Sequence, residues 1–507
     1  MKKLIFPALT ALTLIVTSGF DKFSEIDEKK LLSYKIIDAN NISTVIWNDG
    51  MLDKHWSGSS AGFEWPKGTG KTAIYTSGLW LSSKVNDSIR VSIYYYNSEF
   101  TPGYFDYASQ TAQGYNDPAY RVYKVSPDFP SGNSEYDSWN VWPVNQGAPW
   151  IDNNNNGIYE PPSDSPLLKG TQNFFCSFTD GYLPSGIVSR PAPPLRAEIH
   201  LYAWSKEFSN CADAVNYEYK IINKNRNAWT DMSAALWSDT DLGTSINDKA
   251  GTDSLLNLIF VYNGGNVDPI YGTAPPSVGY VIKEASGHGL QKSDYASKWG
   301  CPEDCPIDSL QRYRVMHGLR VDGSRWVNPV TNTQTNFPHS GDPVSQSGWI
   351  DSTQGERYCI IGSIFGNVLP LDTIEFSMVT FIKRGGNNLL SVAELKNCVS
   401  SVISVNNQAS ELSEDFMLYQ NYPNPFNPST VIGYQLAVSS FVKLIIYDVL
   451  GKEVETLVNE KQGAGTYQVE FDTRQVSRQG KGLASGIYFY TLKAGEFTTT
   501  KRMLLIK

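Results

Sequence analysis

The sequence predicts an all-β protein, in which a large β-sandwich-like body is followed by a smaller C-terminal β-sandwich. Short runs rich in Val, Ile, Tyr, Phe and Thr recur along the 507 residues, as is typical of strands. Gly, Pro, Asn, Asp and Ser separate these runs, and such residues favour turns. All 13 Trp occur at or before Trp349, so the two parts also differ in composition.

The chain begins with the pattern of a secretory signal peptide. Lys2 and Lys3 give a positive start, Leu4–Val16 is apolar, and small residues follow up to Gly19. The apolar run is too short for an ordinary membrane-spanning helix, and no later segment is long and apolar enough for one. Residues 1–19 are therefore predicted to direct export and to be removed.

Residues 20–399 are predicted to form the β-rich body, either as one large sandwich or as two packed ones. Two segments have a weaker helical pattern, namely Ser24–Ile37 and Val392–Asn397. The expected strands, in order, are Asn41–Trp47, Thr72–Leu81, Ser88–Tyr96, Ala197–Trp204, Ala214–Ile222, Leu255–Tyr262, Ser277–Ile282, Arg357–Ile364 and Ile374–Lys383.

The polar residues 400–415 are predicted to form a linker to a tail at residues 416–507. About seven short strands in some ninety residues is the size of an immunoglobulin-like sandwich. Phe441–Tyr447 is apolar on both faces, which predicts a central strand. The expected strands are Thr430–Leu436, Phe441–Val449, Glu453–Val458, Tyr467–Phe471, Ile487–Leu492 and Phe497–Ile506.

Several tail segments, taken in order, resemble the type A C-terminal sorting domain of the type IX secretion system of Bacteroidetes and related bacteria. The matching segments are Gln420–Pro428, Ile446–Gly451, Ala484–Phe489 and the basic and apolar end of the chain. The additional polar residues Gln475–Gly482 depart from the family pattern and are predicted to lengthen a surface loop. The positions carried over from the family are Asn421, Pro423, Asn424, Pro425, Phe426, Gly451, Gly486, Lys501, Arg502 and Lys507.

This resemblance implies a route and two partners. The tail is expected to engage the type IX translocon, and a sortase is expected to remove the tail and to attach the body to a surface glycolipid or release it. Together with the signal peptide, this implies a secreted or outer-membrane cell-surface protein. The body resembles the uncharacterised β-rich regions that precede such tails, through segments such as Trp47–Gly50 and Asp239–Gly243. That second resemblance implies no activity.

The charge distribution argues against a nucleic-acid partner. The predicted tail holds ten Lys or Arg and seven Asp or Glu, a net charge of +3. Loss of Lys2 and Lys3 lowers the net charge of the chain from −9 to −11, which leaves −14 on residues 20–415. An acidic body repels phosphate backbones, whereas it suits solubility and the binding of cations.

The chain has an even number of cysteines, which in an exported protein favours disulfides. Sequence alone does not choose among the pairings, although Cys301 and Cys305 form the best local pair. A zinc site that combines these two with His288 or His317 is the alternative. The six cysteines are Cys176, Cys211, Cys301, Cys305, Cys359 and Cys398.

The segment Asp152–Glu160 has the spacing of an EF-hand-like calcium loop. Side-chain oxygens stand at loop positions one, three and five, and Gly157 at position six permits a sharp turn. The usual bidentate Glu at position twelve is replaced by Ser163, and Asp164 follows it. A plain Asn-rich turn is the alternative. The predicted calcium ligands are Asp152, Asn154, Asn156, Ile158 through its carbonyl group, Glu160 and Asp164.

A second acidic group comprises Asp239, Asp241, Asp248 and Asp253. It is compatible with a second calcium loop, with paired catalytic carboxylates or with a solvated turn. Two carboxylates hydrolyse glycosides when a cleft holds them at a suitable separation, and the sequence does not give that separation. The glycine-rich stretch Gly68–Thr72 resembles a phosphate-binding loop, but a strand pattern follows it where that motif requires a helix.

The sequence therefore favours an exported, non-catalytic binding or structural protein with calcium-stabilised loops. A polysaccharide or another surface component is the expected ligand, because Trp and Tyr rings offer amphipathic contact area to sugars. The alternative is a secreted hydrolase, for example a glycoside hydrolase, that uses carboxylates of the body. A cleft lined by two carboxylates, one with a raised pKa, would favour the enzyme, and a flat aromatic face would favour the binding protein.

Overall fold

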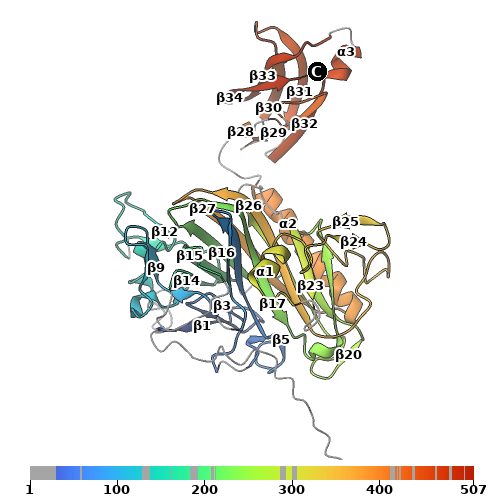
Figure 1. Ribbon diagram of the computed structural model, residues 1–507. Helices are drawn as coiled ribbons and strands as arrows, with labels where there is room; N and C mark the ends of the chain where they lie inside the picture. The colour runs from blue at the N-terminus through green and yellow to red at the C-terminus, as the bar shows by residue number, and fades with distance from the viewer. Residues whose placement is uncertain are drawn as a thin grey trace, which may run out of the picture. The chain divides into compact units, whose positions relative to one another are not determined.

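The structure, a computed structural model, consists of two compact units, Met1–Val399 and Ser400–Lys507, here called the body and the tail (Figure 1). No helix among the described residues is long and apolar enough to cross a membrane. The described residues are 30–57, 60–96, 98–127, 138–161, 163–182, 192–206, 211, 213–285, 293–299, 305–410, 417–418, 421, 424–436, 440–462, 465–478, 482–495 and 497–506. The predicted signal peptide lies outside them.

Within the described residues, two large antiparallel sheets make up most of the body. The eight-stranded sheet has the order β1-β2-β3-β6-β17-β26-β23, with β7 paired to β6. Its strands are β1 (Tyr34–Ile37), β2 (Thr44–Trp47), β3 (Met51–Leu52), β6 (Thr76–Val85), β7 (Ser88–Ile93), β17 (Trp229–Thr240), β23 (Tyr295–Trp299) and β26 (Arg357–Val368).

The nine-stranded sheet has the order β11-β14-β15-β16-β27-β22-β19-β18 in the described residues, with β8 paired to β14. Its strands are β8 (Thr101–Pro102), β11 (Tyr123–Val125), β14 (Gln172–Thr179), β15 (Ala197–Ser205), β16 (Ala214–Asn223), β18 (Asp248–Asp253), β19 (Leu258–Asn263), β22 (Ser277–Ala285) and β27 (Thr373–Lys383).

The two sheets pack face to face around one apolar core, which confirms the predicted sandwich-like body. Side chains alternate between the two faces of a strand, and β17 shows how. Ala234 and Leu236 point into the core shared with Tyr217 of the nine-stranded sheet. Ala235 and Trp237 point to the outer face, where helix α1 (Ser309–Val315) contributes Val315 to a second cluster.

Short two-stranded hairpins and 3-10 helices lie in the segments that connect the strands of the two sheets. Gly68 and Gly70 lie in the turn of the hairpin that β4 and β5 form, so a strand follows the glycines as predicted. The hairpins are β4 (Phe63–Glu64) with β5 (Thr72–Ile74), β9 (Tyr104–Asp106) with β10 (Thr111–Gln113), β12 (Trp150–Ile151) with β13 (Ser165–Pro166), β20 (Val267–Asp268) with β21 (Gly272–Thr273) and β24 (Trp326–Asn328) with β25 (Thr333–Thr335). In the part of the chain that the structure describes, 3-10 helices include Pro118–Tyr120, Val144–Gln146 and Ser245–Asn247.

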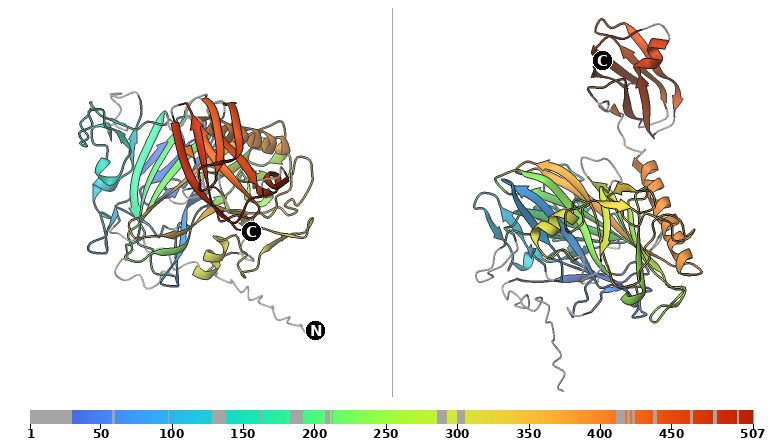
Figure 2. Two further views of the ribbon diagram at one scale, coloured as in Figure 1. Left: turned by 90° about the horizontal axis from the view of Figure 1, so that it is seen from above. Right: turned by 45° about the vertical axis from the view of Figure 1, so that its right-hand side comes forward.

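One of the two helix predictions is wrong, and the other is correct but too short. Tyr34–Ile37 is a strand rather than the end of a helix, because it pairs with β2 and buries Ile37. Helix α2 runs over Asn388–Ser410, so it continues well beyond the predicted turn and into the predicted linker. Val392, Leu395 and Val399 are buried, and α2 runs along the outside of the body (Figure 2).

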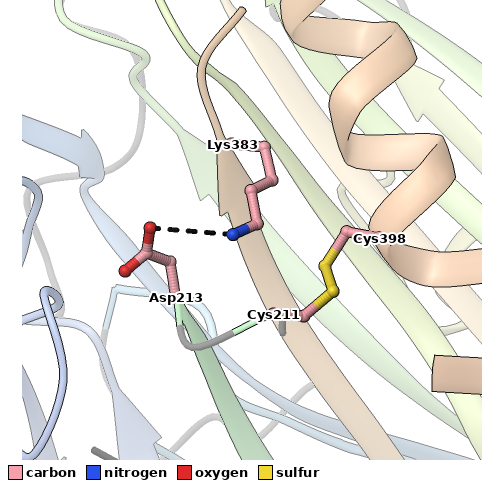
Figure 3. Close-up of a disulfide and its surroundings, with 4 residues drawn as sticks. All are labelled: Cys211, Asp213, Lys383 and Cys398. Atoms are coloured by element: carbon pink, nitrogen blue, oxygen red, sulfur yellow. Dashed lines mark ion pairs between the residues drawn. A yellow bond between two sulfur atoms is a disulfide. The ribbon is translucent and has the colours of Figure 1, made fainter. Parts of the chain in front are cut away.

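A disulfide between Cys211 and Cys398 fastens α2 to the body. Figure 3 shows Cys398 on the helix, and Cys211 near Asp213, which directly precedes β16. Lys383, at the end of β27, lies 3.9 Å from the Asp213 carboxylate. The bond joins positions 187 residues apart in sequence, so it closes a long loop and restricts the unfolded chain.

The other cysteines differ from the expectation of complete pairing. Cys176 and Cys359 are free thiols buried in the core, where they pack as small apolar side chains. Cys305 is disulfide-bonded, so it has no thiolate to offer the zinc ion of the alternative prediction. Cys301 and His288 lie outside the described residues, and the Cys301–Cys305 pair stays a prediction.

In its described residues the tail has seven strands in two sheets, of order β28-β29-β32 and β31-β30-β33-β34, which share one apolar core. β30 is central, as predicted, but only one of its faces is buried: Val442 lies in the core and Phe441 is 57% exposed. Helix α3 (Thr473–Arg478) begins before the predicted loop and buries Val476. The strands are β28 (Met417–Leu418), β29 (Ser429–Leu436), β30 (Ser440–Tyr447), β31 (Glu453–Gln462), β32 (Gly465–Asp472), β33 (Gly486–Ala494) and β34 (Phe497–Leu505).

Candidate functional site

Three carboxylates meet on the outer face of the eight-stranded sheet. Asp239 lies near the end of β17 and, like Trp237, points away from the core, because alternate residues share a face. β26 pairs with β17 and places Tyr358 opposite Asp239. Asp241 follows β17 and Glu356 precedes β26, so both lie at the same end of this strand pair. One oxygen from each of Asp239, Asp241 and Glu356 lies within 4.8 Å of the others, and these three residues are here called the carboxylate cluster.

Burial and neighbouring carboxylates raise the pKa of Asp239 and of Asp241. Burial, and then the charges of Asp241 and Glu356, raise the pKa of Asp239 to about 8. Burial and the charge of Glu356 raise the pKa of Asp241 to about 6. No ion pair among the described residues includes any of the three.

Two tyrosines orient the cluster from one side. The Tyr96 hydroxyl group donates to Asp239 Oδ2 at 3.0 Å and lies 3.0 Å from the Tyr358 hydroxyl group. The Tyr358 hydroxyl group donates to Glu356 Oε1 at 2.7 Å. Burial raises the pKa of both phenols, and the charge of Asp239 adds to the shift, so both keep their protons and serve as donors. Tyr95 and Trp237 pack beside them, with ring centroids 4.8 Å apart and planes inclined by 43°.

Two oxygens of the cluster have no hydrogen-bond partner among the described residues, namely Asp239 Oδ1 and Asp241 Oδ1. Asp239 is only 3% exposed, so little water reaches it. A buried carboxylate oxygen without a donor costs free energy and is rare in folded proteins. The cluster is therefore chemically suited to a positively charged or hydrogen-donating ligand.

The structure does not bring Asp248 and Asp253 into this cluster. Asp248 is fully buried, and its carboxylate accepts hydrogen bonds from the Leu242 backbone N–H at 3.0 Å and from Asn263 Nδ2 at 3.0 Å. Asp253 pairs with Lys396 of α2 at 3.0 Å. Both residues thus have structural partners of their own, and the four-residue acidic group predicted from sequence divides into two parts.

The predicted calcium loop connects β12 to β13, and its polar side chains turn inward. Asp152 Oδ2 accepts from the Gly157 backbone N–H at 2.8 Å, and Asn156 Oδ1 accepts from the Ile158 backbone N–H at 2.7 Å. Glu160 Oε2 accepts from Asn156 Nδ2 at 2.7 Å. Gly157 has φ = +74°, the left-handed conformation that favours glycine at the sharp turn.

Asn154 and Asp164 also accept hydrogen bonds from the backbone of this loop. Asn154 Oδ1 accepts from the Asn156 backbone N–H at 3.0 Å. Asp164 is fully buried, and its two oxygens accept from the backbone N–H groups of Asn153 and Glu160 at 3.0 and 2.8 Å. Asp164 therefore holds the two arms of the loop together, a use of its carboxylate that the spacing of the motif does not suggest.

Asn421, Asn424 and Phe426 of the sorting motif contact the last two strands of the tail, β33 and β34. The Asn421 backbone N–H donates to the Tyr490 hydroxyl group at 2.9 Å, and Asn424 Oδ1 accepts from the Leu504 backbone N–H at 2.8 Å. Phe426 is 2% exposed and exchanges backbone hydrogen bonds with residues 504 and 506 of the terminal strand segment.

The remaining motif positions occupy turns and strands. Gly451, with φ = +77°, closes the turn after β30, and Gly486 begins β33. Lys501 and Arg502 belong to β34, opposite Tyr490 and Phe489. Pro425 is exposed next to Phe426, and Pro423 and Lys507 lie outside the described residues.

The sequence prediction missed Glu356, Tyr96 and Tyr358. None of them belongs to a local motif, and each lies more than a hundred positions from Asp239 in the chain. Glu356 directly precedes a strand that the sequence does predict. Only the pairing of that strand with β17, which the sequence prediction did not recognise as a strand, would have brought it to the site.

Comparison with known proteins identifies the tail. Residues 420–507 match the family model of the secretion system C-terminal sorting domain. No curated protein matches the chain.

Solved structures show only distant likeness. A polysaccharide lyase is 9% identical with a TM-score of 0.19, and the match covers 61% of this chain and 34% of that chain. The adhesin domain of Epf from Streptococcus pyogenes is 10% identical with a TM-score of 0.14, covering 66% of this chain and 92% of that one. Dimeric latent PorU from Porphyromonas gingivalis is 9% identical with a TM-score of 0.16, covering 58% and 31%. Scores this low define no shared fold, and the chain spans about a third of the polysaccharide lyase.

Proposed function

The chain carries a C-terminal sorting domain for type IX secretion, and we propose that its body works outside the cell as a non-catalytic binding or structural module with a calcium-stabilised loop. The sorting domain implies export to the cell surface or the medium. A sortase would remove the tail, and the body would remain anchored or be released. A polysaccharide or another surface component is the proposed ligand.

The observation that carries the calcium part of this proposal is the geometry of the Asp152 loop. Oxygens of Asp152, Asn154, Asn156 and Glu160 share one turn and hydrogen-bond to its backbone or to one another. Oxygen atoms of this kind are the ligands that calcium prefers. The ion would replace several weak exposed hydrogen bonds and hold an exposed loop in one conformation.

An exposed aromatic pair supports the binding part of the proposal. Trp56 is 48% exposed and stacks on Tyr34, with ring centroids 6.2 Å apart and planes inclined by 9°. Trp47 also packs against Tyr34, with ring centroids 5.0 Å apart. Exposed rings with nearly parallel planes are suited to stack on sugar rings.

Limited proteolysis tests the calcium loop. We expect calcium to slow cleavage between residues 152 and 164 about tenfold or more, because cleavage requires local opening and a bound ion stabilises the closed loop. Asp152→Asn should lose this protection. Cleavage positions and rates are read by mass spectrometry with calcium and with a chelator.

Asp106→Asn is the matched control for this experiment. Asp106 is another acid that caps an exposed turn through two backbone N–H groups, and it lies outside the calcium loop. The control should keep the calcium effect at residues 152–164. Equal cleavage of the wild-type loop with and without calcium would contradict the proposal.

Fractionation of the native organism, with mass spectrometry of the mature termini, tests the route. We expect a surface or medium product that begins near Phe20 and lacks the tail. Truncation at residue 416 should leave the body in the periplasm. A periplasmic wild-type product with an intact tail would refute this route.

A secreted hydrolase is the second candidate function. The observation that favours it is the proximity of the Asp239 and Asp241 oxygens, within 4.8 Å, since retaining glycosidases place two carboxyl groups about 5 Å apart. Release of reducing sugar ends by the purified protein, abolished in Asp241→Asn, would favour this candidate over the binding module.

A further inference from the structure

We propose that Asp239, Asp241 and Glu356 bind a divalent cation of the calcium type on the outer face of the body. This site is separate from the Asp152 loop and does not depend on the function proposed above. Its ligands come from two strands that are distant in sequence, so it is formed by the tertiary structure rather than by a loop motif.

The separation of the three carboxylates fits one shared ion. Calcium binds oxygen at about 2.3–2.6 Å, so two ligands on opposite sides of the ion are about 5 Å apart. One oxygen of each member of the carboxylate cluster lies within 4.8 Å of the others. Rotations of side chains would therefore suffice to coordinate one ion, and β17 and β26 would keep their register.

Buried oxygens without partners show that the site is chemically incomplete. Asp239 is 3% exposed, and its Oδ1 atom accepts no hydrogen bond within the described residues. Asp241 Oδ1 is in the same state. Two carboxylate oxygens without donors among the described residues in one cluster favour a cation over a neutral donor, because a cation also relieves the repulsion between neighbouring carboxylates.

The tyrosines make this a preorganised site. Tyr96 holds Asp239 through Oδ2, and Tyr358 holds Glu356 through Oε1. Asp239 and Glu356 thus each have one oxygen fixed by a phenol, and Asp239 Oδ1 is left without a donor among the described residues. Ligands whose orientation is fixed by outer hydrogen bonds bind metal more tightly than free ones.

The surroundings explain why no basic side chain among the described residues takes the place of the cation. Arg357 follows Glu356 directly, but successive residues of a strand point to opposite faces. Its guanidinium group lies on the other side and pairs with Asp351, Nε to Oδ2 at 2.9 Å. The one nearby basic residue in sequence therefore pairs elsewhere and forms no ion pair with the carboxylate cluster.

The ligand set selects a hard cation. All three side chains offer carboxylate oxygen, which suits calcium, magnesium and manganese, whereas zinc sites are richer in His and Cys. Glu356 is exposed, so the ion would be reached from solvent. Three protein ligands leave several positions to water or to the oxygens of a bound ligand.

Calcium titration of the purified, chelator-treated protein tests the proposal, with binding followed by calorimetry and by terbium luminescence excited through neighbouring rings such as Trp237. We expect Glu356→Gln and Asp241→Asn each to weaken one calcium equivalent at least tenfold. Asp152→Asn should leave this equivalent unchanged, so that failure of the loop site and failure of the carboxylate site are distinguishable.

Glu375→Gln is the matched control, because Glu375 is an exposed carboxylate on β27 that pairs with Lys220 at 3.6 Å and lies outside the cluster. Circular dichroism and thermal unfolding without calcium verify that each variant is folded, and Glu356→Gln is the safest variant because the residue is exposed. If Glu356→Gln and Asp241→Asn bind as many calcium ions as the wild type with unchanged affinity, the proposal is wrong.

Discussion

At the scale of single residues, two buried aspartates near the same strand pair have opposite electrostatic environments. Burial would raise the pKa of Asp351, but Lys298 and Arg357 hold it below its ordinary value. Burial raises the pKa of Asp239, and acidic Asp241 raises it further. The strand alternation decides this difference, because it sends Arg357 to one face and the carboxylate cluster to the other.

His339 lies in the environment of Asp351 and Lys298. Burial, and then the charge of Lys298, lower its pKa from 6.5 to about 4. Its ring packs on Trp349, with centroids 4.7 Å apart. The folded protein therefore keeps His339 neutral at pH values where the unfolded chain binds a proton.

This difference predicts a pH dependence of stability. Since the folded pKa of about 4 lies below the unfolded value of 6.5, protonation favours the unfolded chain as the pH falls between these values. We expect the free energy of unfolding to lose about 1 to 2 kcal/mol through this group between pH 7.5 and pH 5.

His339→Asn tests this prediction, because Asn tolerates the positive φ of 57° at this position. Urea unfolding at both pH values gives the difference in stability between wild type and variant. This difference should shift in favour of the variant at pH 5. The same difference at both pH values would contradict the prediction.

At the scale of elements, the tail depends on its N-terminal loop being fixed to the last strand. Phe426 is buried against Phe471, with ring centroids 5.9 Å apart, and pairs with the segment around Leu505. Phe441 lies on the exposed face of β30. Two phenylalanines of one small domain thus differ mainly in burial.

We expect Phe426→Ala to destabilise the tail by about 3 kcal/mol or more, because it removes a buried ring and leaves a cavity. Phe441→Ala, the matched control, should change the stability of the tail by less than about 1 kcal/mol. Pulse proteolysis in urea, with tail fragments identified by mass spectrometry, measures both.

Tryptophan fluorescence provides an internal reference, because every Trp lies at or before Trp349 and therefore in the body. The fluorescence midpoint in urea should stay the same in both variants. Equal losses of tail stability for the two variants would show that burial of Phe426 is not what holds the tail.

At the scale of the whole molecule, the body is one large sandwich whose strands come from distant parts of the chain. β6 pairs with β17, and β17 with β26, across more than a hundred residues on each side. The Cys211–Cys398 disulfide adds a covalent link between a loop and α2. Such long-range pairings explain why local sequence patterns predicted where the strands lie but did not predict which strands pair with one another.

The local sequence patterns predicted many of the strands of the fold. Expected strands such as Ala197–Trp204, Ala214–Ile222 and Ile374–Lys383 correspond to β15, β16 and β27 within a residue or two, since each carries apolar side chains at regular intervals. The sequence did not predict β17 as a strand, because Ser, Thr, Ala and Asp make up most of its residues. Those small and polar residues are compatible with a strand only because β6 and β26 flank it and bury it.

By itself, the sequence determined the all-β class, the sorting tail, the central position of β30 and the local spacing of the Asp152 loop. Each of these depends on residues close together in the chain, where alternation and turn chemistry act directly. The tertiary structure alone decided that Glu356 joins Asp239 and Asp241, that Asp248 and Asp253 separate from them, and that Cys211 meets Cys398. These contacts follow from strand register and sheet packing, which bring distant residues together and which no local pattern encodes.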